Sequence, residues 1–177
     1  VFAFPVSYQL GTISCPITDV KPDNVRKLCS MRIFRHALDF FAALDELCKP
    51  REFVPVVACH NLAFDMYTIS PWLDSHECRV LAKSQRKPIT FTILDEGGKP
   101  CLVIWDTLVF SQQPLARMGE DCGYHKAVGE WDYELIRTPE TPLSPNELEY
   151  AKDDIYSLLT WLSWWCSMNP DIEPGKL

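Results

Sequence analysis

The sequence predicts an α/β fold, because helix and strand patterns alternate along the chain. Residues 33–47 carry apolar side chains at three- and four-residue spacing, as on one face of a helix. A near-continuous apolar run follows at 53–59, and a further helical segment comes directly after it. Two more apolar runs, at 90–94 and 101–105, flank a Gly-containing loop and predict a β-hairpin.

The first predicted element is a strand at 1–10, which is rich in Val, Phe and Tyr. Gly11 interrupts this pattern, and the strand can resume as far as about Cys15. Two prolines then mark a loop. The helix at 33–47 follows, and Pro50 comes just after its end.

The run at 53–59 has the β-branched composition of a central parallel strand that is covered on both faces. Pro55 cannot donate a backbone hydrogen bond, so we expect strand pairing to begin after it. The next predicted helix spans 65 to about 73, and Pro71 limits it to a short or kinked one.

After a short predicted helix at 115–118, the clearest helix signal begins at Ser144 and Glu147, which have capping-box spacing with proline at the first helical position. We expect one domain over 1–168 and a linker or frayed tail at 169–177.

Composition and charge narrow the class of protein. The 177 residues are 47% apolar, and no apolar run approaches the roughly 20 residues that span a membrane, so we expect a soluble intracellular protein without a membrane partner. Eight scattered cysteines without a Cys-x-x-Cys pair fit unpaired thiols in a reducing compartment. The net charge of -7 argues against nucleic-acid binding by charge alone, yet it suits an enzyme whose carboxylates hold divalent metals.

A basic cluster stands out in this acidic chain, formed by Lys83, Arg86, Lys87 and Lys99. Such a cluster can contact a polyanion such as nucleic acid. A solvated face of the predicted hairpin is the simpler interpretation.

Polar residues follow the apolar run at 53–59, where the sequence reads His60, Asn61, Leu62, Ala63, Phe64 and Asp65. Open α/β sheets commonly place ligands and chemistry where strands end, so Asp65 is a candidate functional carboxylate. The structural alternative is that Asp65 caps the following helix and that His60 and Asn61 are turn residues. The hexapeptide alone does not decide between them.

Tyr150 and Asp154 lie four residues apart on the predicted C-terminal helix and therefore project from one face. A carboxylate and a phenol on one face can hold a metal and orient the water that it activates in phosphodiester hydrolysis. Alternatively, Tyr150 packs and Asp154 is solvated on an amphipathic helix. Asp153 points elsewhere and is not expected to share this role.

Combined in this order, the motifs resemble the 3′-5′ exonuclease domain of family B DNA polymerases, specifically the protein-primed subgroup of phages and linear plasmids. The family's second exonuclease motif, Asn-x-x-Phe/Tyr-Asp, is matched by Asn61, Phe64 and Asp65. The third, Tyr-x-x-x-Asp, is matched by Tyr150 and Asp154. The resemblance implies a ribonuclease-H-like (DnaQ-like) exonuclease fold, a mixed sheet flanked by helices.

The resemblance extends over nearly the whole chain and implies further roles. It implies that His60, Asn61 and Tyr133 contact the single-stranded 3′ end, with Phe64 supporting the site. Thr107 and Leu108, which follow Asp106, match positions on the side of the single-stranded DNA or the priming protein.

The chain departs from the family pattern in two places. No Asp-x-Glu, the family's first exonuclease motif, occurs before Gly11, and we expect this motif to lie just before Val1; loss of activity is the other explanation. The subgroup's catalytic lysine corresponds to Val128, and Lys126 is the candidate that could replace it through a loop shift.

The resemblance implies a proofreading function, in which two Mg²⁺ or Mn²⁺ ions are bound by Asp154 together with an upstream Asp-x-Glu. Asp65 is expected to hold a water on the second metal. Lys126 and Tyr150 complete the expected catalytic set. The expected partners are a single-stranded DNA 3′ end, a polymerase domain after Leu177 and a terminal (priming) protein. The alternatives are a catalytically inactive module that binds single-stranded DNA or a priming protein, and a stand-alone nuclease of the same fold.

Overall fold

A computed structural model of the protein describes residues 7–127 and 137–172. The chain divides into two compact units. Among the described residues, unit 1 comprises 37–112, and unit 2 comprises two parts of the chain, 7–36 before it and 113–127 with 137–172 after it.

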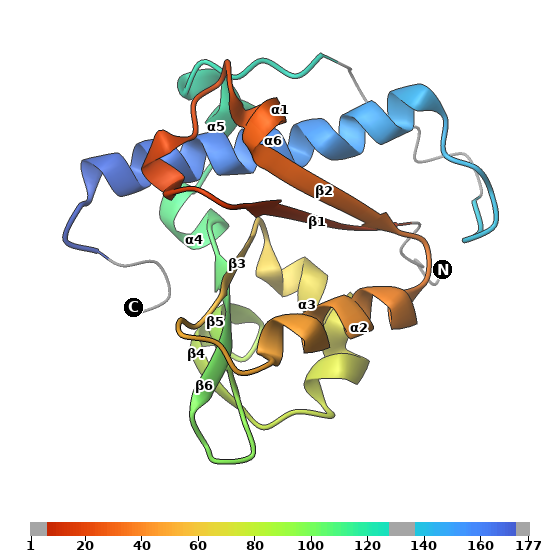
Figure 1. Cartoon of the computed structure of the whole chain (residues 1–177), viewed down its shortest axis with the longest axis vertical. Coiled ribbons are helices and arrows are strands. Elements are labelled where there is room, and N and C mark those ends of the chain that lie inside the picture. Colours follow the sequence, from red (N-terminus) through yellow and green to blue (C-terminus); the bar gives the residue numbers. More distant parts are fainter. Residues whose placement is uncertain (1–6, 128–136, 173–177) are drawn as a thin grey trace. The chain divides into compact units, whose positions relative to one another are not determined.

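Unit 1 contains a four-stranded sheet with helices beside it (Figure 1). Its helices are α2 (Ala37–Cys48), α3 (Leu62–Leu73) and α4 (Leu108–Ser111), and its strands are β3 (Val56–Cys59), β4 (Cys78–Ser84), β5 (Lys87–Leu94) and β6 (Pro100–Asp106). The strand order is β3-β6-β5-β4. β3 and β6 run parallel, and the other two pairs are antiparallel. The sheet is therefore mixed, and the predicted α/β class and hairpin are confirmed.

The strand buried most completely is β6, in which residues 102–105 are all buried. We expected the run at 53–59 to form the central strand, and this was wrong for the described sheet, where β3 is an end strand and Val56 is 40% exposed. Only four residues pair, because Pro55 cannot donate to a ladder. The predicted parallel direction of this strand is confirmed.

Helices α2 and α3 pack against the sheet through one apolar cluster. Its buried members are Leu44 of α2, Leu62, Ile69, Trp72 and Leu73 of α3, Phe91 and Ile93 of β5, and Leu102 and Ile104 of β6. Alternate strand positions face the same side of a sheet, which is why positions 91, 93, 102 and 104 all meet the helices. Each such side chain contributes about 1.5–3 kcal/mol when it is fully buried.

Helix α3 begins earlier than the expected 65–73 and continues through Pro71 to Leu73. A proline leaves the carbonyl four residues before it without a helical donor. Here that carbonyl belongs to Tyr67, and the Ser70 hydroxyl donates a hydrogen bond to it at 3.2 Å. The helix therefore tolerates Pro71 in its last turn.

Unit 2 combines a two-stranded antiparallel ribbon with a long C-terminal helix (Figure 1). The ribbon is β1 (Tyr8–Ile13) and β2 (Cys29–Phe34); the helices are the 3₁₀ turn η1 (Ile17–Asp19), α1 (Val25–Leu28), α5 (Leu115–Asp121) and α6 (Pro145–Met168). Helix α6 contacts β1, η1, α1 and α5. It is the element on which unit 2 is assembled.

The prediction of a helix from residue 33 was wrong at its start. Ile33 and Phe34 belong to β2, where they pair with Gln9 and Tyr8. The helix begins at Ala37. The last residues of the strand and the first turns of the helix happen to continue one apolar spacing of three and four residues, so the sequence pattern did not mark the boundary between them.

Gly11 does not interrupt the first strand but permits its contact with α6. Gly11 pairs with Met31 in the ribbon. A Cβ atom at this position would come within 2.4 Å of Ile155 Cγ2 and 3.0 Å of Cys29 Sγ. Only the absence of a side chain allows the strand and helix to approach so closely.

The predicted start of α6 is confirmed. The Ser144 amide donates to Glu147 Oε2 at 2.7 Å, and the Glu147 amide donates to Ser144 Oγ at 3.2 Å. This capping box satisfies two amides that the first turn would otherwise leave without partners. Among the described residues, no helix combines the length and the apolar character needed to cross a bilayer.

Candidate functional site

The parallel pairing of β3 and β6 brings two polar segments of unit 1 together. Cys59 and Asp106, the last residues of these strands, are partners in the register. Because parallel strands end at the same edge, His60 and Asn61 emerge beside Thr107. The strand-end position expected for this cluster is therefore observed.

Asp106 organises the two segments. It is only 3% exposed, and its Oδ1 accepts hydrogen bonds from the Asn61 amide at 3.0 Å and the Leu108 amide at 2.9 Å. The carboxylate thus fixes the backbone at the start of α3 and at the start of α4. The sequence marked Asp106 as a strand-end acid but gave it no place in the site.

His60 and Thr107 also meet at this edge. The Thr107 hydroxyl donates to the Cys59 carbonyl at 2.8 Å, and His60 Nδ1 lies 3.2 Å from the same hydroxyl oxygen. Since a hydroxyl has one proton to donate, Thr107 accepts from His60. This contact assigns the ring proton to Nδ1 and fixes the plane of the imidazole.

The next residues place Asp65 inside the first turn of α3. Asn61 is the N-cap and has a left-handed backbone with φ 75°, a conformation that asparagine tolerates better than most residues. Its carbonyl accepts from the Phe64 amide at 2.8 Å. The Phe64 side chain is 64% exposed, so it is available for contact rather than part of the core of unit 1.

Burial, followed by the negative charge of Asp106, raises the pKa of Asp65 to about 7. Two carboxylates in a poorly solvated place disfavour each other's ionisation. Asp65 is therefore a carboxylate whose charged form is unfavourable in the protein without a nearby cation.

The raised pKa of Asp65 predicts a pH-dependent stability. The folded protein holds a proton on Asp65 up to about pH 7, whereas an ordinary aspartate loses it near 3.8, so stability falls as pH rises between these values. In EDTA, Asp65→Asn is expected to be more stable than the wild type by a few kcal/mol at pH 8, since one pKa unit corresponds to about 1.4 kcal/mol. Near pH 4 the difference should vanish.

Urea unfolding at both pH values checks this expectation. The matched control is Glu52→Gln, which alters an exposed carboxylate of the same unit. A pH-independent effect of Asp65→Asn would show that the ionisation of Asp65 does not limit the stability of the protein.

In unit 2, the predicted residues Tyr150 and Asp154 lie on one face of α6, and Lys126 reaches both. The Lys126 ammonium forms an ion pair with Asp154 Oδ1 and lies 4.7 Å from the centre of the Tyr150 ring. The side chains of Lys126 and Asp154 are 16% and 25% exposed. A carboxylate, a phenol and an ammonium group thus form one partly solvated cluster.

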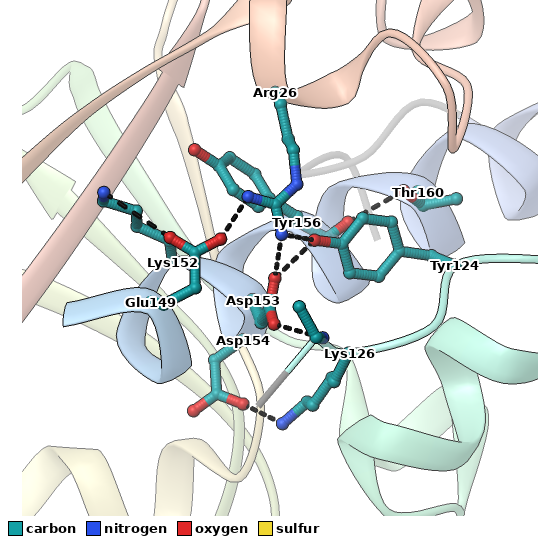
Figure 2. Close-up of polar contacts among 10 residues, drawn as sticks. Arg26, Tyr124, Lys126, Glu149, Lys152, Asp153, Asp154, Tyr156 and Thr160 are labelled. Atoms are coloured by element: carbon teal, nitrogen blue, oxygen red, sulfur yellow. Dashed lines mark hydrogen bonds and ion pairs between the residues drawn. The ribbon is translucent and has the colours of Figure 1, made fainter. Parts of the chain in front are cut away.

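Asp153, next to Asp154, lies at the centre of a second cluster (Figure 2). This carboxylate is fully buried, and it accepts hydrogen bonds from Arg26 at 2.7 Å, from the Tyr124 hydroxyl at 2.5 Å and from the Ala127 amide at 2.7 Å. Arg26 also pairs with Glu149. The sequence contained no sign of this cluster, because Arg26 is distant along the chain and Asp153 was expected only to point away from the site of Asp154.

The cluster around Asp153 controls the ionisation of its neighbours. Burial and the hydrogen bond to Asp153 raise the pKa of Tyr124, so its hydroxyl keeps its proton and remains a donor. The Arg26 guanidinium, hydrogen-bonded to Glu149, lowers the pKa of that carboxyl. All three partners of Asp153 are therefore donors throughout the physiological pH range.

Some predicted site residues lie outside what the structure describes. Tyr133 and Val128 fall in 128–136, outside the described residues. Asp65 belongs to unit 1 and Asp154 to unit 2, so each carboxylate is described within its own unit. In residues 7–127 and 137–172, no three or more His, Cys, Asp or Glu side chains are grouped closely enough to hold a metal ion.

The predicted basic cluster is divided by the fold. Lys83, Arg86 and Lys87 are exposed at the β4–β5 turn, whereas Lys99 lies in the loop at the other end of β5. No ion pair of these four side chains is found within the described part of the chain. We call the three residues at the turn, Lys83, Arg86 and Lys87, the tip cluster.

Comparison with known proteins identifies the fold. No protein-family model and no curated protein matches the chain. Solved structures of phi29 DNA polymerase do match: the complex with primer-template DNA and incoming nucleotide substrates (TM-score 0.66, 22% identity), the orthorhombic crystal form (0.66, 18%) and the complex with single-stranded DNA (0.65, 17%).

These matches cover most of the chain but a minor part of the polymerase. They span 81%, 94% and 96% of this chain and 26%, 31% and 32% of the polymerase chain. The predicted resemblance to a protein-primed family B polymerase is confirmed at the level of the fold.

Proposed function

We propose that this chain is the 3′-5′ exonuclease domain of a protein-primed DNA polymerase, which removes nucleotides from the 3′ end of single-stranded DNA. The observation that carries the proposal is the face of α6, where Asp154, Tyr150 and Lys126 meet in a fold that resembles part of phi29 DNA polymerase. These side chains supply the ligand, the orienting hydroxyl and the cation that phosphodiester hydrolysis requires.

The oxygen donors fit Mg²⁺ or Mn²⁺, which are bound by carboxylates and water. The raised pKa of Asp65 beside Asp106 supports the same conclusion, because a divalent cation would favour the ionised form that the protein alone disfavours. Asp154 would hold a metal directly, and Asp65 would hold one through a water molecule. When bound, two such ions stabilise the attacking and leaving oxygens of the displacement.

The protein's own groups then position the reactants. The Tyr150 hydroxyl orients the attacking water, while the Lys126 ammonium holds the Asp154 carboxylate in place through their ion pair. His60, Asn61 and Thr107 would contact the 3′-terminal nucleotides, with Phe64, Leu108 and Tyr133 offering surfaces against which bases and sugars can pack.

A catalytically inactive module that binds single-stranded DNA or a priming protein is the second candidate. One observation favours it. Only Asp65 and Asp154 are predicted metal ligands among the described residues, and no three His, Cys, Asp or Glu side chains in that part of the chain are grouped closely enough to hold a metal ion. Both candidates predict binding of single-stranded DNA, and only the exonuclease predicts its metal-dependent hydrolysis.

The proposal is tested with the full-length protein that contains this chain. A 5′-labelled single-stranded oligonucleotide is incubated with Mn²⁺ and resolved on a sequencing gel. We expect stepwise shortening from the 3′ end with release of nucleoside monophosphates, and complete inhibition by EDTA. Binding of the oligonucleotide without metal-dependent shortening would support the inactive module instead.

If the chain binds DNA, the tip cluster is expected to contribute through phosphate contacts. Changing Lys83, Arg86 and Lys87 together to Gln should weaken binding of single-stranded DNA and reduce the slope of log K against log salt by about 0.7 for each lost contact. Fluorescence anisotropy across a salt series measures this slope. The control, with the same change at Lys49, Arg51 and Lys99, should retain the wild-type slope; equal slopes in all three proteins would contradict the prediction.

A further inference from the structure

Asp153 and Asp154 are neighbours on α6, yet they meet the segment 124–127 in different ways. Asp154 pairs with the side chain of Lys126 (Figure 2), whereas Asp153 binds Tyr124, two residues before that lysine, and Ala127, directly after it. The two oxygens of Asp153 divide this task. Oδ1 accepts from the Tyr124 hydroxyl, and Oδ2 accepts from the Ala127 amide.

This arrangement holds the segment at both ends of a short span. The Tyr124 ring is buried and packs edge-on against Tyr156 of α6 at 6.2 Å, so the first attachment includes packing as well as a hydrogen bond. The second attachment is to the backbone of Ala127. The backbone of Lys126 is therefore held in a fixed position against α6.

Arg26 completes the arrangement from α1. Its guanidinium binds Asp153, Glu149 and the Tyr124 hydroxyl, and it lies 5.1 Å from the centre of the Tyr156 ring. Removing a carboxylate from water is costly, and an apolar side chain of similar size often gives equal or greater stability. Stability alone therefore does not account for an aspartate at this position.

We propose that Asp153 is a positioning residue that holds the segment 124–127 so that Lys126 reaches Asp154 and Tyr150. The catalytic meaning of this inference rests on the proposed exonuclease function. The positioning itself does not, because it concerns where the Lys126 ammonium lies in the protein without metal or DNA.

The positioning is tested by the reactivity of Lys126 toward an acetylating reagent, measured by mass spectrometry in EDTA. In the wild type, Lys126 should react more slowly than the more exposed Lys152. Asp153→Asn keeps the shape but presents an amide that cannot accept from both sides. We expect the acetylation rate of Lys126 to rise at least about tenfold, as the loss of a hydrogen bond to a charged group implies, while that of Lys152 stays unchanged.

Two further variants separate positioning from stability. Tyr124→Phe removes the hydroxyl that donates to Asp153 and accepts from Arg26, but it keeps the ring. It should therefore fold and give a smaller rise in the rate at Lys126. Leu162→Ala creates a cavity in α6 beyond this cluster and should lower the melting temperature without exposing Lys126. If Asp153→Asn and Tyr124→Phe leave Lys126 protected, or if Leu162→Ala exposes it equally, the inference is overturned.

Activity gives a separate measurement. If the nuclease is active, Asp153→Asn should lower kcat more than it raises KM, and adding it to Lys126→Ala should cause no further loss, since both act through one ammonium group. Additive losses would exclude positioning through Lys126. If the protein has no nuclease activity, the acetylation rates still test whether Asp153 positions Lys126. The positioning inference and the proposed exonuclease function can therefore be rejected independently.

Discussion

Asp154→Ala is expected to abolish metal-dependent shortening of single-stranded DNA, with a loss of about 10³-fold or more in rate. The reason is that a metal ligand contributes several kcal/mol of transition-state stabilisation, and each 1.4 kcal/mol corresponds to a factor of about ten. The rate of 3′ shortening in Mn²⁺ is the measurement. Because Asp154 and its partner Lys126 are both partly exposed, water can solvate the lysine that is left behind, and the variant should remain folded.

The matched control for Asp154→Ala is Asp171→Ala, which removes an exposed carboxylate from the same unit. It should retain the wild-type rate and the same sensitivity to EDTA. If Asp154→Ala shortened DNA as fast as this control, the activity would come from elsewhere and the proposed site would be wrong.

Arg26→Met is expected to lower the free energy of unfolding by about 2–4 kcal/mol. The change leaves the fully buried carboxylate of Asp153 without its cation and removes the pair with Glu149. The side chain of Arg26 is 43% exposed, so water can partly replace it, and the expected loss lies toward the lower end of values for a broken buried ion pair. Urea unfolding followed by tryptophan fluorescence measures the change.

Two comparisons test the cause of this loss. Arg117→Met breaks exposed pairs with Glu120 and Asp121 and should cost at most about 1 kcal/mol. The double variant Arg26→Met with Asp153→Asn should lose less than the sum of the single variants, because the second change removes the unpaired charge. Strict additivity would show that the two side chains do not depend on each other.

Local signals in the sequence predicted much of the fold. The loop between β5 and β6 contains paired glycines, and the start of α6 has Ser144 and Glu147 at capping spacing, so both elements could be recognised from a few adjacent residues. Strand β4 could not, since Val80 and Leu81 are both exposed and no alternation marks a buried face. The order of strands depends on long-range pairing that no local pattern contains.

Some residues of the candidate site could be predicted from local motifs, and others could not. Asp65, Tyr150 and Asp154 were identified from motifs, and the structure places Lys126 against the last two. The contact between Arg26 and Asp153 joins residues 127 positions apart. A single arginine in a stretch that was predicted to be a loop and a second aspartate on a helix carry no sign that they will meet. Only the folded chain shows that Asp153 is buried.

The two segments of unit 2 have a consequence for how the protein is made. All of Ala37–Gln112 is synthesised between the segment that carries β1, β2 and α1 and the segment that carries α6. The intervening unit has its own sheet and apolar cluster, so it can fold as soon as it leaves the ribosome. The early ribbon must wait for α6, so a nascent chain whose α6 has not yet emerged from the ribosome carries the ribbon without the helix that β1 contacts, and chaperones can bind it in this state.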